Sequence, residues 1–161
     1  MPKTYEPIAT YTAPSAQASY TFSSIPSTYT DLILIVDGSL SGLSVIKIQL
    51  NGDTATNYSY TYMYGSGSAT GSGRVANEAF GTIGYSSTSS ERFTAITHFM
   101  NYSNTTTNKT FIDRDNSTLT QVAATANLWR STAAINSIKV FPNTTNLATG
   151  TTLTLYGVKS A

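Results

Sequence analysis

Few side chains of this sequence could perform chemistry, and its single histidine is the first to consider. A general base needs a nucleophile or an orienting acid beside it, and no such group lies close to His98 in the sequence. Its neighbours two positions away are Ile96 and Met100. We therefore expect His98 to have a structural or interface role. One histidine also excludes a multi-histidine metal site. The absence of cysteine excludes disulfides, thiolate zinc sites and cysteine nucleophiles.

Two carboxylates form the next candidate. Asp113 and Asp115 would share a face if a strand continued through them. Glycosidases use two carboxyl groups that lie about 5–9.5 Å apart, usually from different strands. The run from Asp113 to Asn116 is instead typical of a strand end and turn with a local ion pair. We expect no catalytic residue here, and a hydrolase that uses the two aspartates is a rival hypothesis.

The same run begins like a calcium-binding EF-hand loop, with acids at its first and third positions. Thr118 then stands where glycine is needed, and Ala124 stands where the bidentate glutamate should be. We expect no metal site and no cofactor. A calcium site completed by other loops is the alternative.

Four tyrosines at alternate positions, Tyr58, Tyr60, Tyr62 and Tyr64, would stand on one face of a strand. Tyrosine buries a large area while its hydroxyl stays hydrogen-bonded, so such a stripe favours a core or interface face. Aromatic rings also offer flat faces to sugars. We therefore expect these four residues to form an aromatic interface. A glycan-binding platform is the alternative.

The glycine-rich segment from Gly65 to Gly73 follows this stripe. Its spacing does not match G-x-G-x-x-G, and no Lys-Ser/Thr pair follows, so it is not a phosphate cradle. Its composition predicts a flexible loop that orders on binding a partner. The candidate contacts in this loop are Gly67, Ser68, Ala69 and Thr70.

The segments that must position these residues alternate apolar and polar side chains with a period of two nearly everywhere. This pattern predicts strands. The strongest apolar run, Leu32 to Val36, predicts a central strand buried on both faces or in the middle of a sandwich. No segment shows helical spacing over ten or more residues. We predict an all-β, jelly-roll-like antiparallel sandwich of about ten strands with no long helix. The weaker predicted strands are 8–12, 19–22, 75–85 and 109–113.

Composition limits the partners. Of 161 residues, 49 are Ser or Thr, only 11% are charged, and the net charge is +1, so nucleic acid is not expected as a partner. No run approaches the roughly 20 apolar residues of a membrane span, and no signal peptide is visible. One domain over residues 10–161 is expected after an N-terminal arm, residues 1–9. A surface with so little charge also predicts association into a homo-oligomer.

Four segments carry a resemblance to a known family. They run from Phe22 to Leu34, from Leu50 to Tyr60, from Leu128 to Ile138 and from Gly150 to Val158. Together they resemble a module common in virion structural proteins of tailed bacteriophages, especially those of cyanobacterial and other aquatic hosts. The resemblance extends over nearly the whole chain, and its motifs are strand-and-turn signatures.

This resemblance implies a jelly-roll-like sandwich on the surface of a virion, made in the host bacterial cytoplasm. The expected function is a non-enzymatic capsid cement (decoration) protein, a dimer or trimer that binds the major capsid protein and stabilises the shell against internal DNA pressure. The short arm would contact the shell through Tyr5, Pro7 and Ile8. The alternative is a tail or head fibre tip, a receptor-binding module that recognises host surface glycans.

Overall fold

The computed structural model describes residues 4–86, 91–117 and 121–159. Within these ranges, the segments in which apolar and polar residues alternate form twelve β-strands. No helix of any kind occurs in those ranges, so none is long and apolar enough to cross a membrane. The strands are β1 (Tyr5–Thr12), β2 (Tyr20–Phe22), β3 (Asp31–Ser39), β4 (Ser44–Leu50), β5 (Tyr58–Ser66), β6 (Thr70–Glu78), β7 (Gly81–Ser86), β8 (Arg92–Phe99), β9 (Lys109–Ser117), β10 (Gln121–Trp129), β11 (Ile138–Pro142) and β12 (Thr152–Val158).

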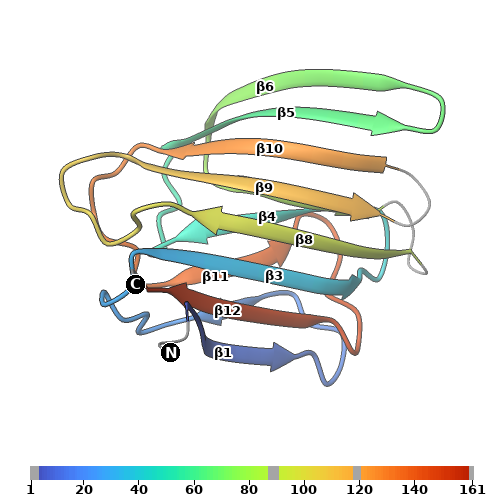
Figure 1. Cartoon of the computed structure of the whole chain (residues 1–161). Coiled ribbons are helices and arrows are strands. Elements are labelled where there is room, and N and C mark those ends of the chain that lie inside the picture. The colour runs from blue at the N-terminus through green and yellow to red at the C-terminus, as the bar shows by residue number, and fades with distance from the viewer. Residues whose placement is uncertain (1–3, 87–90, 118–120, 160–161) are drawn as a thin grey trace.

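The strands form two antiparallel sheets, which confirms the predicted all-β sandwich (Figure 1). The larger sheet has the order β1-β12-β3-β8-β9-β10-β5-β6, and the smaller sheet has the order β2-β11-β4-β7. Early strands pair with late ones: β1 with β12, β2 with β11 and β5 with β10. This nested pairing places the first and last strands side by side at one end of the larger sheet.

The core lies between the two sheets. Leu32, Leu34 and Val36 of β3 are fully buried there, whereas Ile33 and Ile35 are half-buried on the outer face of the larger sheet. The apolar run is therefore a central strand, but only one of its faces lies in the core. The opposing side chains of β4 are Ile46, Ile48 and Leu50, all fully buried.

One tyrosine hydroxyl joins the two sheets inside the core. The Tyr58 hydroxyl of β5 accepts a hydrogen bond from the Leu50 amide of β4 at 2.8 Å and donates to the Leu50 carbonyl oxygen at 3.4 Å. The ring of Tyr58 stacks on Trp129, with 6.2 Å between the ring centroids. This tyrosine is therefore a core residue whose polar end is satisfied by backbone groups.

The expected flexible loop is mostly strand. β5 continues to Ser66 and β6 begins at Thr70, so only residues 67–69 form the turn between them, closed by the Ser66 amide, which donates to the Ala69 carbonyl oxygen at 2.7 Å. Composition predicted flexibility because glycine is a poor strand former. Pairing of every residue from Thr70 to Gly73 with β5 overrides that preference.

Three other boundaries differ from expectation. Residues 5–9, expected in an arm, belong to β1, which pairs with β12 at the edge of the larger sheet, where Pro7 and a bulge are tolerated. The run from Asp113 to Asn116, expected as a strand end and turn, lies inside β9 because β9 pairs with β8 and β10 on both sides. The single strand expected over 75–85 is divided between β6 and β7.

The two sheets differ in width, and this difference creates the candidate site. β7 is the last strand of the smaller sheet, and it packs across β8, β9 and β10. β5 and β6 continue the larger sheet beyond it, at the top of Figure 1. The inner face of the larger sheet is thus left partly uncovered over β6 and over β5 beyond the buried Tyr58.

Candidate functional site

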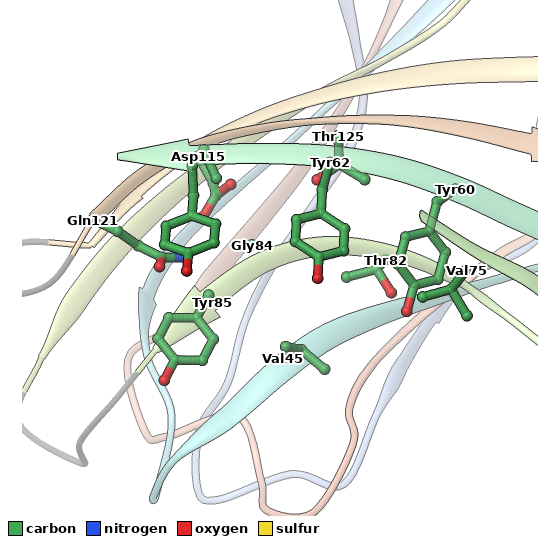
Figure 2. A pocket seen from close by; sticks show the side chains of 12 residues that line it. Val45, Tyr60, Tyr62, Val75, Thr82, Gly84, Tyr85, Asp115, Gln121 and Thr125 are labelled. Atoms are coloured by element: carbon green, nitrogen blue, oxygen red, sulfur yellow. The ribbon is translucent and has the colours of Figure 1, made fainter. Parts of the chain in front are cut away.

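A cavity of about 300 Å³ lies where the inner face of the larger sheet emerges from beneath β7 (Figure 2). This volume is at the lower end of the range of about 300–1,000 Å³ for ligand pockets. We call the cavity the tyrosine groove. Its lining residues come from β4, β5, β6, β7, β9 and β10: Val45, Tyr60, Tyr62, Tyr64, Val75, Thr82, Gly84, Tyr85, Asp115, Gln121, Ala123 and Thr125.

The tyrosine stripe of β5 forms one wall of the groove. Ring centroids are 6.3 Å apart between Tyr60 and Tyr62 and 6.5 Å apart between Tyr62 and Tyr64. All three rings line the groove, whereas Tyr58 lies in the core. The expected row of four therefore stands on one face but divides into a structural residue and a row of three accessible rings.

Two glycines of β6 allow these rings to lie across the neighbouring strand. A Cβ atom at Gly71 would lie 2.7 Å from the Tyr64 ring, and one at Gly73 would lie 2.7 Å from the Tyr62 hydroxyl oxygen. Both distances are shorter than real Cβ contacts, so a side chain at either position would have to displace the tyrosine ring. The glycines of the segment expected to be a flexible loop therefore make room for the tyrosines of the adjacent strand.

The opposite wall is β7, an edge strand held by polar side chains of the larger sheet. Asn127 of β10 accepts a hydrogen bond from the Thr82 amide at 2.9 Å and donates to the Thr82 carbonyl oxygen at 3.0 Å. Asp113 of β9 accepts from the Gly84 amide at 3.2 Å, and Asp115 accepts from the Tyr85 amide. These bonds satisfy backbone groups at the sheet edge.

A bulge in β7 brings Tyr85 into the groove. The register between β4 and β7 shifts at this point, so that Val45 pairs with Tyr85 and Ile46 pairs with Ile83. Gly84 lies between these two partners with φ +64°, a left-handed conformation that favours glycine. Bulges redirect side chains at such positions, and Tyr85 and Val45 both lie at the groove in Figure 2.

Both aspartates of β9 point inward and have raised pKa values. Burial raises the pKa of Asp113 to about 7 and that of Asp115 to about 6. Asp113 is completely buried and also accepts from the Thr97 hydroxyl at 2.8 Å. Asp115 alone lines the groove, and its Oδ2 has no hydrogen-bond partner among the described residues. Of these two aspartates, Asp115 is therefore the one that a ligand in the groove can contact.

The other sequence candidates lie elsewhere. His98 is on the outer face of β8, with its Nε2 2.9 Å from an Asp31 carboxylate oxygen, which fits a structural role. Tyr5, Pro7 and Ile8 lie on β1, at the opposite edge of the larger sheet from β6. The other expected contacts, Gly67, Ser68, Ala69 and Thr70, lie at the β5–β6 turn. The two expected contact regions are therefore not brought together.

Some groove residues had no signal in the sequence. Tyr85, Thr82 and Gln121 lie on strands other than β5, and only tertiary packing places them opposite the tyrosine stripe. The described ranges contain no group of three or more His, Asp or Glu side chains that could hold a metal ion. Thr118, one of the positions that departs from the EF-hand pattern, lies outside the described residues, whereas Ala124 is in β10.

Comparison with known proteins gives no family. No protein-family model matches the chain, and no curated protein matches it. Among solved structures, the galectin LEC-6 of Caenorhabditis elegans is 12% identical with a TM-score of 0.38, over 94% of this chain and 96% of that one.

Two other solved structures are less similar. The alginate lyase Aly36B, solved in complex with an alginate tetrasaccharide, is 8% identical with a TM-score of 0.29, over 83% of this chain and 72% of that one. Scytalido-glutamic peptidase is 10% identical with a TM-score of 0.28, over 92% of this chain and 66% of that one. Similarities at this level support neither a family nor a function.

Proposed function

We propose that this protein is a non-enzymatic binding module whose tyrosine groove holds a glycan, as a receptor-binding module would hold a glycan of the host surface. The observation that carries this proposal is the row of Tyr60, Tyr62 and Tyr64 across an uncovered sheet face. Their spacings of 6.3 and 6.5 Å present successive aromatic surfaces along the groove. Rings with a polar hydroxyl suit a ligand that has both apolar faces and hydroxyl groups.

The carboxyl groups favour binding over catalysis. Hydrolysis of a glycosidic bond by two carboxyl groups requires both to reach the bond. Asp113 is fully buried and holds the Thr97 hydroxyl and the Gly84 amide, so only Asp115 is available to a ligand. A single carboxyl group in a groove of tyrosines fits recognition of a ligand.

Calorimetry with purified protein and a panel of oligosaccharides tests this function. We expect Tyr62→Ala to weaken glycan binding about tenfold, or ~1.4 kcal/mol. The matched control is Met63→Ala, because Met63 is the next residue on β5, is 64% exposed and lies on the opposite face. Equal binding by both variants, or no binding of any glycan by the native protein, would overturn the proposal.

A second candidate, the capsid cement protein, is favoured by a different surface. The outer face of the larger sheet carries exposed apolar side chains: Met63 is 64%, Val122 61% and Ile112 48% exposed. The half-buried Ile35 and Ile96 form a cross-strand pair on the same face. Exposed apolar side chains gathered on one sheet face are typical of protein-docking sites.

Co-sedimentation with assembled phage shells tests the cement function. A cement protein binds the major capsid protein of the assembled shell through this outer face, so Ile112→Asp should abolish co-sedimentation while Tyr62→Ala leaves it intact. The expected oligomer, a dimer or trimer, is measured by light scattering of the same samples. Absence of binding to shells by the native protein would exclude this candidate and leave the glycan-binding proposal unaffected.

A further inference from the structure

We infer that the tyrosine groove selects oligosaccharides built of neutral or amino sugars, which donate hydrogen bonds at Asp115 and contact Thr82, and that it rejects uronate sugars. This inference rests on the proposed glycan-binding function and names the class of glycan. It is carried by the polar atoms at the two ends of the groove and by the charges of its lining.

Two buried side-chain oxygens in the described part of the chain have no hydrogen-bond partner there, and both belong to groove residues. They are Oδ2 of Asp115 and Oγ1 of Thr82. Nearly all buried polar groups of native proteins are paired, because an unpaired one costs about 1–3 kcal/mol. Asp115 is only 7% exposed, so bulk water has little access to it, and because Asp115 lines the groove we assign the missing partner of its oxygen to a ligand group bound there.

The strand register places these two oxygens at opposite ends of the tyrosine row. Asp115 pairs with Ala123, which pairs with Tyr64. Thr82 is bonded through its backbone to Asn127, which pairs with Tyr60. Ala123 and Asn127 are four residues apart on β10, a distance of about 13 Å along a strand.

The view in Figure 2 agrees with this order. It has Asp115 and Gln121 toward one side, Thr82 and Tyr60 toward the other, and Tyr62 between them. A ligand that reaches both oxygens therefore passes over the rings and is longer than one sugar unit. An oligosaccharide has this length and carries hydroxyl groups along it.

The charges of the groove decide which oligosaccharides fit. Its twelve lining residues contain one acid, Asp115, and no Lys or Arg. The charged group nearest along β9 on the same face is Asp113, another acid, whose pKa is raised by burial and by the charge of Asp115. The facing residues of the neighbouring strands, Ala95 and Ala123, are uncharged. A sugar carboxylate beside Asp115 would meet repulsion, and the twelve lining residues include no cation to compensate it, whereas an ammonium or hydroxyl group can donate to Asp115.

A glycan array with matched neutral, amino and uronate oligosaccharides of gluco, galacto and manno configuration tests the selectivity at pH 7.5. We expect binding to neutral or amino members and none to uronates. Binding of uronates as strong as that of the matched neutral members would overturn this inference and leave the proposed function standing. Binding of no member would overturn the proposed function and the inference with it.

Two variants then test the named oxygens on the neutral, amino and uronate members of the array. Asp115→Asn should weaken binding of an amino sugar about tenfold and relieve the exclusion of uronates, whereas Asp37→Asn, which removes the same charge from the outer face, should change neither. Thr82→Val should weaken binding several-fold against Thr110→Val, a matched change on the outer face of β9. Thermal melting confirms that each variant is folded. If each groove variant binds as its control does, the inference is wrong.

Discussion

The ring of Tyr62 lies so close to Gly73 on the adjacent strand that a methyl group at Gly73 would stand 2.7 Å from the tyrosine hydroxyl oxygen. The same relationship links Tyr64 and Gly71 on the next cross-strand pair. Two of the bulky rings on one strand are thus matched by glycines on its neighbour, whereas Tyr60 pairs with Val75. The matching determines where the rings point, and therefore the shape of the groove.

Gly73→Ala should displace the Tyr62 ring and weaken glycan binding about tenfold, because the added methyl group occupies the space of the hydroxyl. Calorimetry measures the loss. Gly65→Ala is the control, since a Cβ atom there would meet only a Thr70 methyl group at 4.0 Å. Near-ultraviolet circular dichroism should change for Gly73→Ala and not for Gly65→Ala. Unchanged binding by the first variant would show that the position of this ring does not matter to the ligand.

The stability of the fold should fall as the pH rises from about 4 to about 7. Burial raises the pKa of Asp113 to about 7 and that of Asp115 to about 6 in the folded protein, above the value of 3.8 expected when the chain is unfolded. The folded state therefore binds more protons than the unfolded state within this window. The stability that this protonation contributes is lost as the two groups ionise. Urea denaturation at intervals of pH measures the free energy of unfolding.

Removing one of these charges should remove part of that dependence. Asp115→Asn should raise the free energy of unfolding at pH 8 by up to about 3 kcal/mol, since each pKa unit corresponds to about 1.36 kcal/mol. At pH 4 the gain should be largely absent. Asp37→Asn, at an exposed ion pair with Arg92, should give no such gain at pH 8. A stability that is flat or rises between pH 4 and 7 contradicts this prediction.

The hydroxyl of Tyr58 should contribute to stability, unlike the hydroxyl of its neighbour in the stripe. Tyr58→Phe leaves the buried amide of Leu50 without its 2.8 Å partner, at a cost of about 1–3 kcal/mol. Tyr60→Phe, in the groove, should cost less than about 0.5 kcal/mol. Chemical denaturation of both variants distinguishes the structural tyrosine from the groove tyrosine. Equal losses would contradict the division of the stripe into two roles.

The attachment of β7 should depend on Asn127. Asn127→Leu removes both hydrogen bonds to the Thr82 backbone, and we expect destabilisation of about 2 kcal/mol or more because two edge groups lose their partner. Hydrogen exchange should increase at the Thr82 amide. Asn116→Leu, on the exposed face of β9, is the matched control and should leave that amide protected. Protection of Thr82 that persists in Asn127→Leu would assign the attachment of β7 to other contacts.

Local pattern alone was sufficient for the all-β sandwich and for the shared face of the tyrosines. The side chains of a strand alternate between its two faces, so Tyr58 to Tyr64 had to stand together wherever the strand was placed. The same rule predicted that Asp113 and Asp115 would share a face if the strand continued through them. It failed at the glycine-rich segment, because composition carries no information on the partner strand. Gly71 and Gly73 lie in β6 because they pair with β5, although the low strand propensity of glycine did not predict a strand there.

The amino-acid sequence by itself determined an antiparallel β fold, a core of alternating apolar residues and a face of four tyrosines, because each depends only on the direction of neighbouring side chains. Tertiary structure decided that the larger sheet extends beyond the smaller one, so that Tyr58 is buried while Tyr60, Tyr62 and Tyr64 line a groove. It also brought Thr82 and Asp115 to that groove from β7 and β9. Such placement depends on contacts between residues distant in the chain, which no local pattern encodes.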